Sequence, residues 1–237
     1  MDHQLRSGPG LSGQAAPCRT HDWLWLTHAV GTWQNPPVTR PSETDRVARA
    51  IAERAEGGFA LVSIDGAGGS GKSTLAADLA ERLGGMGPAT VVHGDDFYRP
   101  MRAAERLLLS PQEGYSQYFD WQRLRDQVLI PLTSGTGARY QRYDWPTGAL
   151  AAGELHDVPR SGVVIVEGVY TARPELADYY DLTVLVEAPR DVCLRRLHER
   201  GHDHGPGNWN ERWRAAEEHY LVITNPGARL DLTVEGY

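Results

Sequence analysis

Lysine is almost missing from this chain. Of the 24 Lys and Arg residues among its 237 positions, only Lys72 is a lysine. A composition rich in Arg, Ala and Gly is typical of GC-rich coding sequence, so the preference for arginine carries little functional information. The exception is informative, because Lys72 lies in the stretch GAGGSGKS and must be explained by the chemistry of that stretch.

Cysteine, excess positive charge and long apolar runs are lacking as well. The net charge of −7 and the pI near 5.7 exclude a general binder of nucleic acid polymers, which needs a basic face. Cys18 and Cys193 form neither a disulfide framework nor a metal-binding pattern. No apolar run reaches the roughly 18 residues of a membrane span, and the stretch Trp23–Trp33 lacks the flanks of a signal peptide. We therefore expect a cytoplasmic protein that needs no membrane.

Residues 1–40 and residues 41–237 differ in composition. The first segment is rich in Gly, Pro, Ser and Gln without a sustained period, which predicts a partly disordered N-terminal arm. Ser42 and Asp45 then form a capping-box signal followed by helical spacing, so a helix is expected from about Pro41 to Ala55. Residues 41–237 have the length of one α/β domain.

Short apolar runs alternate with helical patterns through this domain. The expected strands cover residues 59–65, 89–93, 162–168, 182–188 and 230–236, and the expected helices cover residues 72–83, 120–133, 174–180, 190–200 and 209–224. Strands that are apolar on both faces indicate a parallel sheet with helices on both sides. The pattern predicts an α/β three-layer sandwich around a mainly parallel five-stranded sheet.

The stretch from Gly66 to Ser73 has the spacing G-x-x-x-x-G-K-S between an expected strand and an expected helix, which is the setting of a P-loop. Its glycines let the backbone approach phosphates, and successive N–H groups converge on the anion. Lys72 reaches the β- and γ-phosphates as a compact charge that a planar guanidinium does not replace, and Ser73 is the expected Mg²⁺ ligand. The predicted nucleotide-binding residues are Gly66, Ala67, Gly68, Gly69, Ser70, Gly71, Lys72, Ser73 and Thr74.

Acidic residues follow two of the expected strands. Asp95 and Asp96 come after the second strand and Glu167 ends another, and ligands of an open α/β sheet bind beyond such strand ends. Asp95 is the candidate acceptor for the proton of an attacking hydroxyl, and with Ser73 and Glu167 it completes a candidate Mg²⁺ cluster. The alternatives are a simple turn cap at Asp95 and Asp96 and an ordinary strand-end carboxylate at Glu167.

An arginine-rich helix precedes a loop of Gly and His residues. Its cations, Arg190, Arg195, Arg196 and Arg200, suit a lid at about residues 200–208, in which Arg196 and Arg200 hold the migrating phosphoryl group. A solvated amphipathic helix is the alternative. His202 and His204 lack the further ligands that zinc requires.

The segment Ala138–Gly148 interleaves aromatic and basic residues. Tyr140, Tyr143 and Trp145 either form one face of a strand or stack on a flat ring in a pocket, and the sequence leaves both interpretations open.

The ordered set of motifs resembles the uridine kinase and phosphoribulokinase-like family of P-loop kinases over about residues 60–236. The set comprises GAGGSGKST, DDFYRP, FDWQRL, RYDW, VVIVEGVY, LRRLHERG and NPGARLDLTVEG. The resemblance implies a P-loop NTPase fold with a lid, ATP and Mg²⁺ as cosubstrates, and transfer of the γ-phosphoryl group to a hydroxyl. It implies that Asp95 is the general base, Glu167 a metal or substrate carboxylate, Arg196 and Arg200 lid arginines, and Tyr143 a stacking residue.

The departures from that family fall on the acceptor side. Only one Phe-Asp element is visible, at Phe119, Gly148 stands where the family has a histidine, and Gly201 follows the lid arginine. The DDFYRP and GPGNW segments are also similar to nicotinamide riboside kinases. The expected acceptor-site residues are Asp96, Tyr98, Tyr143, Trp145 and Glu167.

Several acceptors remain open: a nucleoside such as uridine, nicotinamide riboside, a nucleoside monophosphate held by Arg99, Arg102 and Arg106, or another small hydroxylated molecule. A nucleotide-binding regulatory protein that phosphorylates nothing is the alternative from another class. The sequence leaves the oligomeric state open, a homo-oligomer included.

Overall fold

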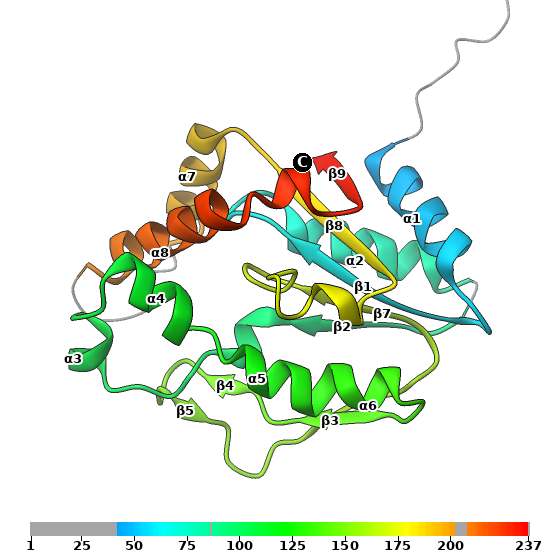
Figure 1. Cartoon of the computed structure of the whole chain (residues 1–237), viewed down its shortest axis with the longest axis horizontal. Coiled ribbons are helices and arrows are strands. Elements are labelled where there is room, and N and C mark those ends of the chain that lie inside the picture. The colour runs from blue at the N-terminus through cyan, green and yellow to red at the C-terminus, as the bar shows by residue number, and fades with distance from the viewer. Residues whose placement is uncertain (1–41, 86, 202–207, 237) are drawn as a thin grey trace, which may run out of the picture. The chain divides into compact units, whose positions relative to one another are not determined.

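The computed structural model describes residues 42–85, 87–201 and 208–236 (Figure 1). The expected N-terminal arm, His202, His204 and most of the expected lid lie outside these residues. In the described part of the chain, none of the helices combines the length and the apolar character that crossing a membrane would require.

Five parallel strands form the central sheet, in the order β2-β7-β1-β8-β9. Their bounds are β1 Phe59–Asp65, β2 Ala89–His93, β7 Gly162–Glu167, β8 Leu182–Glu187 and β9 Leu232–Glu235. All seven residues of β1 are buried, as expected for the middle strand of a covered sheet. The predicted parallel five-stranded sheet is confirmed, with the strand that leads into the P-loop at its centre.

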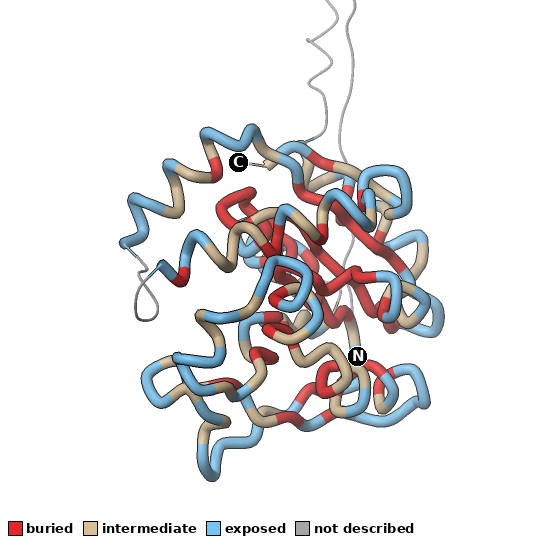
Figure 2. The backbone as a smooth tube through the Cα atoms, turned by 60° about the vertical axis from the view of Figure 1, so that its left-hand side comes forward, coloured by how far each residue is buried: buried red, intermediate tan, exposed pale blue. Residues whose placement is uncertain are grey.

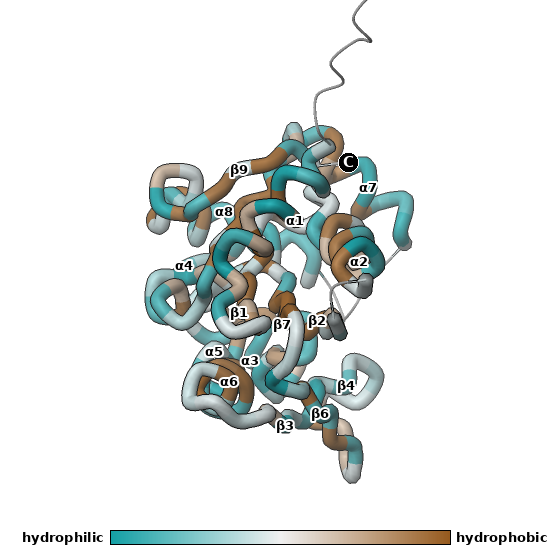
Figure 3. The backbone as a smooth tube through the Cα atoms, turned by 90° about the vertical axis from the view of Figure 1, so that its right-hand side faces the viewer, coloured by the Kyte–Doolittle hydropathy of each residue, from teal (hydrophilic) through white to brown (hydrophobic). Residues whose placement is uncertain are grey.

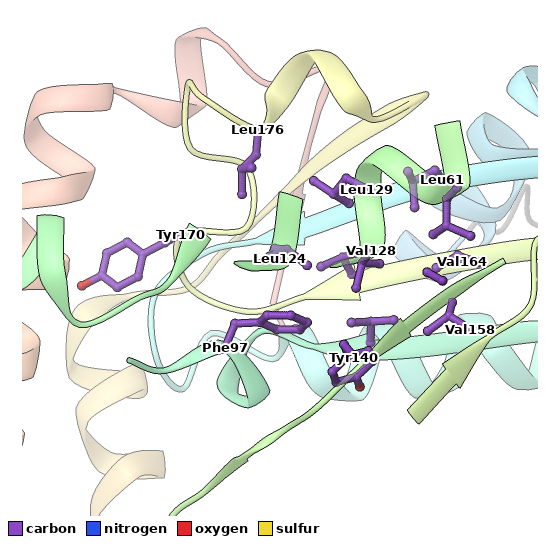
Figure 4. Close-up of a cluster of buried hydrophobic side chains, with 14 of the residues drawn as sticks. Leu61, Phe97, Leu124, Val128, Leu129, Tyr140, Val158, Val164, Tyr170 and Leu176 are labelled. Carbon is purple, nitrogen blue, oxygen red and sulfur yellow. The ribbon is translucent and has the colours of Figure 1, made fainter. Parts of the chain in front are cut away.

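Alternate residues of the central strands point into two separate cores. Ala60, Val62 and Ile64 pack with α1 (Glu43–Arg54) and α2 (Lys72–Leu83) on one face. Leu61 and Val164 pack with the helical run at residues 121–133 on the other face, together with the residues shown in Figure 4. Figure 2 shows burial concentrated in the strands, and Figure 3 shows the same strands as hydrophobic. The predicted three-layer arrangement is therefore confirmed.

The predicted helix at 120–133 is present, but its middle part is π-helical rather than α-helical. Asp120 caps it by accepting a hydrogen bond from the Arg123 amide at 3.3 Å, and the run passes through α5 (Trp121–Leu124), a π-helical turn η2 (Arg125–Leu129) and α6 (Ile130–Thr133). The remaining helices are η1 Gly94–Phe97, α3 Ala103–Arg106, α4 Pro111–Gln117, α7 Arg190–Glu199, α8 Trp209–Thr224 and η4 Pro226–Ala228.

The predicted helix at 174–180 is wrong. Only a short 3-10 turn, η3 (Ala177–Tyr179), forms there. The next residue, Asp181, is already tied to the central strand, since its amide donates to the Leu61 carbonyl at 2.8 Å and its carboxylate accepts from the Leu61 amide at 2.7 Å. The segment between β7 and β8 is thereby anchored to the sheet at its end.

Two small hairpins follow α6. One pairs β3 (Ala138–Tyr140) with β6 (His156–Val158), and the other pairs β4 (Tyr143–Asp144) with β5 (Ala149–Leu150). Tyr140 enters the hydrophobic core, whereas Tyr143 and Trp145 join an aromatic cluster with Tyr98. The strand-face interpretation therefore holds for Tyr140, and stacking on a flat ring stays a prediction for the rest of the segment.

Candidate active site

The loop between β1 and α2 has the backbone that its glycines were expected to allow. Gly66, Gly69 and Gly71 have φ angles of 147°, 81° and 107°, which residues with a Cβ rarely adopt. A Cβ on Gly69 would lie 2.5 Å from the Cys193 carbonyl oxygen. No side chain caps the N-terminus of α2, so the amides there are available to an anion.

Lys72 lies folded against this loop. It is only 7% exposed, and its ammonium group donates to the Ala67 carbonyl at 2.8 Å. The side chain therefore points back along the loop rather than into bulk water. In this position the ammonium group of Lys72 would balance the negative charge of a phosphate chain bound at the loop.

A chain of hydrogen bonds joins three elements through Ser73 of α2, Glu167 of β7 and His93 of β2. The Ser73 hydroxyl donates to Glu167 Oε2 at 3.0 Å, and His93 Nδ1 lies 2.7 Å from Glu167 Oε1. Burial favours the neutral form of Glu167, but the hydrogen bond from His93 and the positive charge of Lys72 outweigh it and lower its pKa. The hydrogen bond to Glu167 in turn raises the pKa of His93. Glu167 is therefore a held carboxylate beside the P-loop serine.

Asp95 follows β2 and faces the same cavity. Its side chain reaches solvent there, yet the protein around the carboxylate desolvates it. This desolvation, with the negative charge of Glu167, raises the pKa of Asp95 to about 6. A carboxyl group with a raised pKa is suited to accept a proton near neutral pH.

The cavity has a volume of about 350 Å³ and a strongly aromatic wall. Tyr98, Trp145, Trp209 and Trp213 line it beside Asp95. Tyr98 and Trp145 have ring centroids 4.7 Å apart. The remaining lining residues are Gly68, Gly69, Lys72, Ser73, Glu167, Gly168, Val169, Leu194, Leu197, His198, Arg200, Asn210 and Arg214.

Most of the predicted catalytic and acceptor residues meet at this cavity. The predicted residues that line it are Lys72, Ser73, Asp95, Tyr98, Trp145, Glu167 and Arg200, together with Gly68 and Gly69 of the loop. Arg196 lies beside it, since its guanidinium donates to the Gly69 carbonyl at 3.1 Å. Among the other loop residues, Gly66, Ala67, Ser70, Gly71 and Thr74 do not line the cavity.

Asp96, which was predicted for the acceptor site, does not line the cavity. Asp96 Oδ2 accepts a hydrogen bond from the Tyr140 hydroxyl at 2.8 Å, and Arg123 donates to the Asp96 carbonyl at 2.7 Å. These contacts turn Asp96 toward the hairpin side of the domain, because adjacent residues of the η1 turn point in different directions.

Tyr143 lies one layer behind the cavity wall rather than in it. It is buried, and its ring packs against Trp145 with centroids 5.1 Å apart. Its hydroxyl accepts a hydrogen bond from Arg106 at 2.7 Å. Tyr143 therefore does not line the cavity, and its ring supports Trp145, which does.

The three arginines considered for an acceptor phosphate are engaged elsewhere. Arg99 contacts Gln122 at 3.3 Å, Arg102 pairs with Glu105, and Arg106 lies over the Trp209 ring at 4.9 Å. None of them lines the cavity, which counts against a nucleoside monophosphate as acceptor.

Trp209, Trp213 and Arg214 were not anticipated as site residues. They lie on α8, which begins after the expected lid. The sequence feature that could have indicated them is the pair Trp209 and Trp213. These residues are four positions apart, which places both indoles on one face of the helix.

The donor set fits a nucleotide with Mg²⁺. The Ser70 hydroxyl is buried in the loop without a hydrogen-bond partner among the described residues, and the α2 amides are uncapped. In the described ranges no group of three or more His, Cys, Asp and Glu gathers to bind a metal unaided. Mg²⁺ in phosphate sites is held by one or two carboxylates with phosphate oxygens, and Ser73 with Glu167 matches that pattern.

Comparisons with known proteins agree with this geometry. The sequence model of the phosphoribulokinase / uridine kinase family matches residues 61–206. A uridine kinase of Ureaplasma parvum serovar 3 is 28% identical over 140 residues, which cover 57% of this chain and 66% of that relative, just under two thirds of its length. A uridine kinase of Deinococcus deserti is 31% identical over 148 residues, covering 60% of this chain and 70% of that protein.

Solved structures agree on the fold. A possible uridine kinase from Bacillus stearothermophilus has a TM-score of 0.63 at 24% identity, covering 81% of this chain and 97% of its own. A putative fructose transport system kinase from Silicibacter sp. TM1040 has a TM-score of 0.62 at 29% identity, covering 82% and 100%. With a family match over more than half of its length, a P-loop between β1 and α2 and this five-stranded sheet, the chain belongs to the phosphoribulokinase / uridine kinase family.

Proposed function

We propose that the protein is an ATP-dependent kinase that transfers the γ-phosphoryl group to a hydroxyl of a small, nucleoside-like acceptor. One observation carries the proposal: Asp95 faces the same cavity as Lys72 and Ser73 of the phosphate-binding loop. A proton acceptor beside a phosphate cradle is the minimum set that a kinase needs. A protein that only binds nucleotide does not require a proton acceptor at this place.

Each residue has a defined part in this proposal. The loop amides and Lys72 bind the triphosphate, and Asp95 orients the acceptor hydroxyl and takes its proton. Ser73 and Glu167, with Asp95 nearby, would hold Mg²⁺, which would supply charge neutralisation of the phosphates when bound. Arg200 lines the cavity and Arg196 contacts the loop, so both are placed to hold the phosphoryl group.

The aromatic wall supports an acceptor with a flat ring. Tyr98, Trp145, Trp209 and Trp213 give apolar faces on which a base or a pyridine ring stacks. Uridine and nicotinamide riboside both carry such a ring. The proposed substrates are therefore small molecules rather than nucleic acid polymers or membranes, in line with the acidic net charge of −7.

A sugar is the second candidate acceptor. The observation in its favour is the 29% identity to a putative fructose transport system kinase, over 100% of that chain. Aromatic side chains can also pack against the apolar faces of sugar rings, so the cavity wall suits both.

The test is an ATP-consumption screen with Mg²⁺ over nucleosides, nicotinamide riboside, nucleoside monophosphates and hexoses. We expect at least one acceptor with a flat ring to accelerate ATP turnover and to be recovered as its phosphate ester. Turnover with hexoses alone would establish the second candidate. If no member accelerates ATP consumption, the regulatory nucleotide-binding alternative is favoured instead.

A further inference from the structure

Helix α8 presents one inward stripe of side chains to the site. Trp209, Trp213, Glu217 and Tyr220 follow one another at spacings of four, four and three residues, which places them on a single helix face. The helix lies beside α4 and is joined to α7 by the ion pair of Arg190 with Glu218 (Figure 1).

Glu217 reaches the phosphate-binding loop directly. Its Oε2 accepts a hydrogen bond from the Gly68 amide at 2.7 Å, although the two residues are 149 positions apart. Glu217 is only 6% exposed, which is rare for a glutamate that is not paired with a cation. Gly68 lines the cavity and Glu217 does not. The carboxylate therefore holds the loop from behind the cavity wall and does not occupy the nucleotide's place.

The neighbours of Glu217 on the stripe hold the same region. The Trp213 ring covers Gly68 so closely that a Cβ there would lie 2.9 Å from it, and the Trp213 indole nitrogen donates to the Tyr98 hydroxyl. The Tyr220 hydroxyl donates to Asp65 Oδ2 at 2.7 Å, and Asp65 Oδ1 accepts from the Gly66 amide at 2.6 Å. The loop is thus held at Gly66 through Asp65 and at Gly68 through Glu217.

We propose that Glu217 is a positioning residue that fixes the phosphate-binding loop through the Gly68 amide and thereby sets its affinity for nucleotide. A glycine-rich loop has much conformational freedom to lose, so a hydrogen bond that orders it before the ligand arrives lowers the cost of binding. The proposal rests on the proposed function, because it assumes that the loop binds ATP.

Two substitutions separate the hydrogen bond from the charge. Glu217→Gln keeps the length and an accepting oxygen but removes the charge. Glu217→Asp keeps the charge but shortens the side chain by one carbon, so that it no longer reaches Gly68. Glu218, the next residue on the exposed face of the same helix, supplies the matched controls Glu218→Gln and Glu218→Asp.

The experiment is calorimetric titration of each full-length variant with Mg·ATP, without an acceptor. We expect Glu217→Asp to raise the Kd about tenfold, the size of one lost hydrogen bond to a charged group. Glu217→Gln and both Glu218 variants should stay within about twofold of wild type. Hydrogen exchange of the 66–70 segment in nucleotide-free protein should be faster in Glu217→Asp alone, which a general loss of stability would not reproduce.

Three results would overturn the assignment or its basis. An unchanged Kd in Glu217→Asp shows that Glu217 does not position the loop, and a loss in Glu217→Gln as large as that in Glu217→Asp shows that the hydrogen bond to Gly68 is not what sets the affinity. Absence of Mg·ATP binding by wild type overturns this inference and the proposed function together. Binding with no transfer to any acceptor overturns the proposed function alone and leaves the role of Glu217 supported by its own titration.

Discussion

Ser73 and Glu167 are 94 residues apart in the sequence and are joined by a hydrogen bond of 3.0 Å. The contact exists because β1 and β7 are paired in parallel, so that the end of β7 lies beside the loop that follows β1. It brings a hydroxyl and a carboxylate with a lowered pKa to one point of the cavity. These are the two protein ligands that we assign to Mg²⁺.

Glu167→Gln should weaken the response to Mg²⁺ more than the response to ATP. The substitution removes one carboxylate ligand while leaving an accepting oxygen for Ser73. We expect the Mg²⁺ concentration for half-maximal activity to rise by roughly 10- to 100-fold, measured by varying free Mg²⁺ at constant ATP. An unchanged Mg²⁺ dependence would show that Glu167 is not a metal ligand.

Lys72→Arg should be nearly as damaging as Lys72→Ala. The ammonium group is 2.8 Å from the Ala67 carbonyl in a buried position, and the larger planar guanidinium does not fit that space. Both variants should lose turnover by roughly 10²-fold or more, whereas Arg82→Lys on the same helix should behave as wild type. Near-normal turnover by Lys72→Arg would contradict our explanation for the single lysine.

The pH dependence of turnover should report Asp95. Desolvation and the charge of Glu167 raise the pKa of Asp95 to about 6, and a general base acts only when ionised. Activity should therefore rise with pH through about 6 and level off above it. The measurement is kcat/KM from pH 5 to 8. A flat profile across this range would remove Asp95 from the proton transfer.

Tyr220→Phe should destabilise the domain without changing its sheet. The Tyr220 hydroxyl donates to Asp65, a fully buried carboxylate whose pKa burial raises. Losing this donor should lower the free energy of unfolding by about 1.5–3 kcal/mol, measured by urea denaturation. The control is Tyr115→Phe, because the Tyr115 ring stacks on Tyr220 with centroids 5.5 Å apart and makes no bond to Asp65. Equal effects of the two substitutions would show that the hydrogen bond to Asp65 contributes no more than a hydroxyl that does not contact Asp65.

Much of the fold followed from local sequence patterns. The strand at 59–65 and the helices at 72–83 and 209–224 have the bounds that their apolar periodicity predicts. The helix predicted at 174–180 does not form, because the anchoring of Asp181 to Leu61 overrides the helical composition of this segment. Local preference decides an element only where tertiary contacts do not compete.

The sequence predicted those candidate-site residues that lie in the phosphate-binding loop or at the end of a strand. Lys72, Ser73, Asp95 and Glu167 were found because loops and strand ends of a parallel sheet converge. The position of Asp96 outside the cavity was not predictable, because the direction of a side chain within a 3-10 turn depends on partners such as Tyr140. Glu217 was missed because its partner lies 149 residues away, and no local pattern encodes such a contact.

The most direct test of the account is transfer of label from γ-³²P-ATP to an acceptor by wild type and Asp95→Asn, with Mg·ATP affinity measured on both. We predict that label reaches the acceptor in wild type, that Asp95→Asn transfers it roughly 10²- to 10⁴-fold more slowly, and that both bind Mg·ATP about equally. Transfer at the wild-type rate by Asp95→Asn would contradict the central claim that this carboxylate takes the proton of the acceptor hydroxyl.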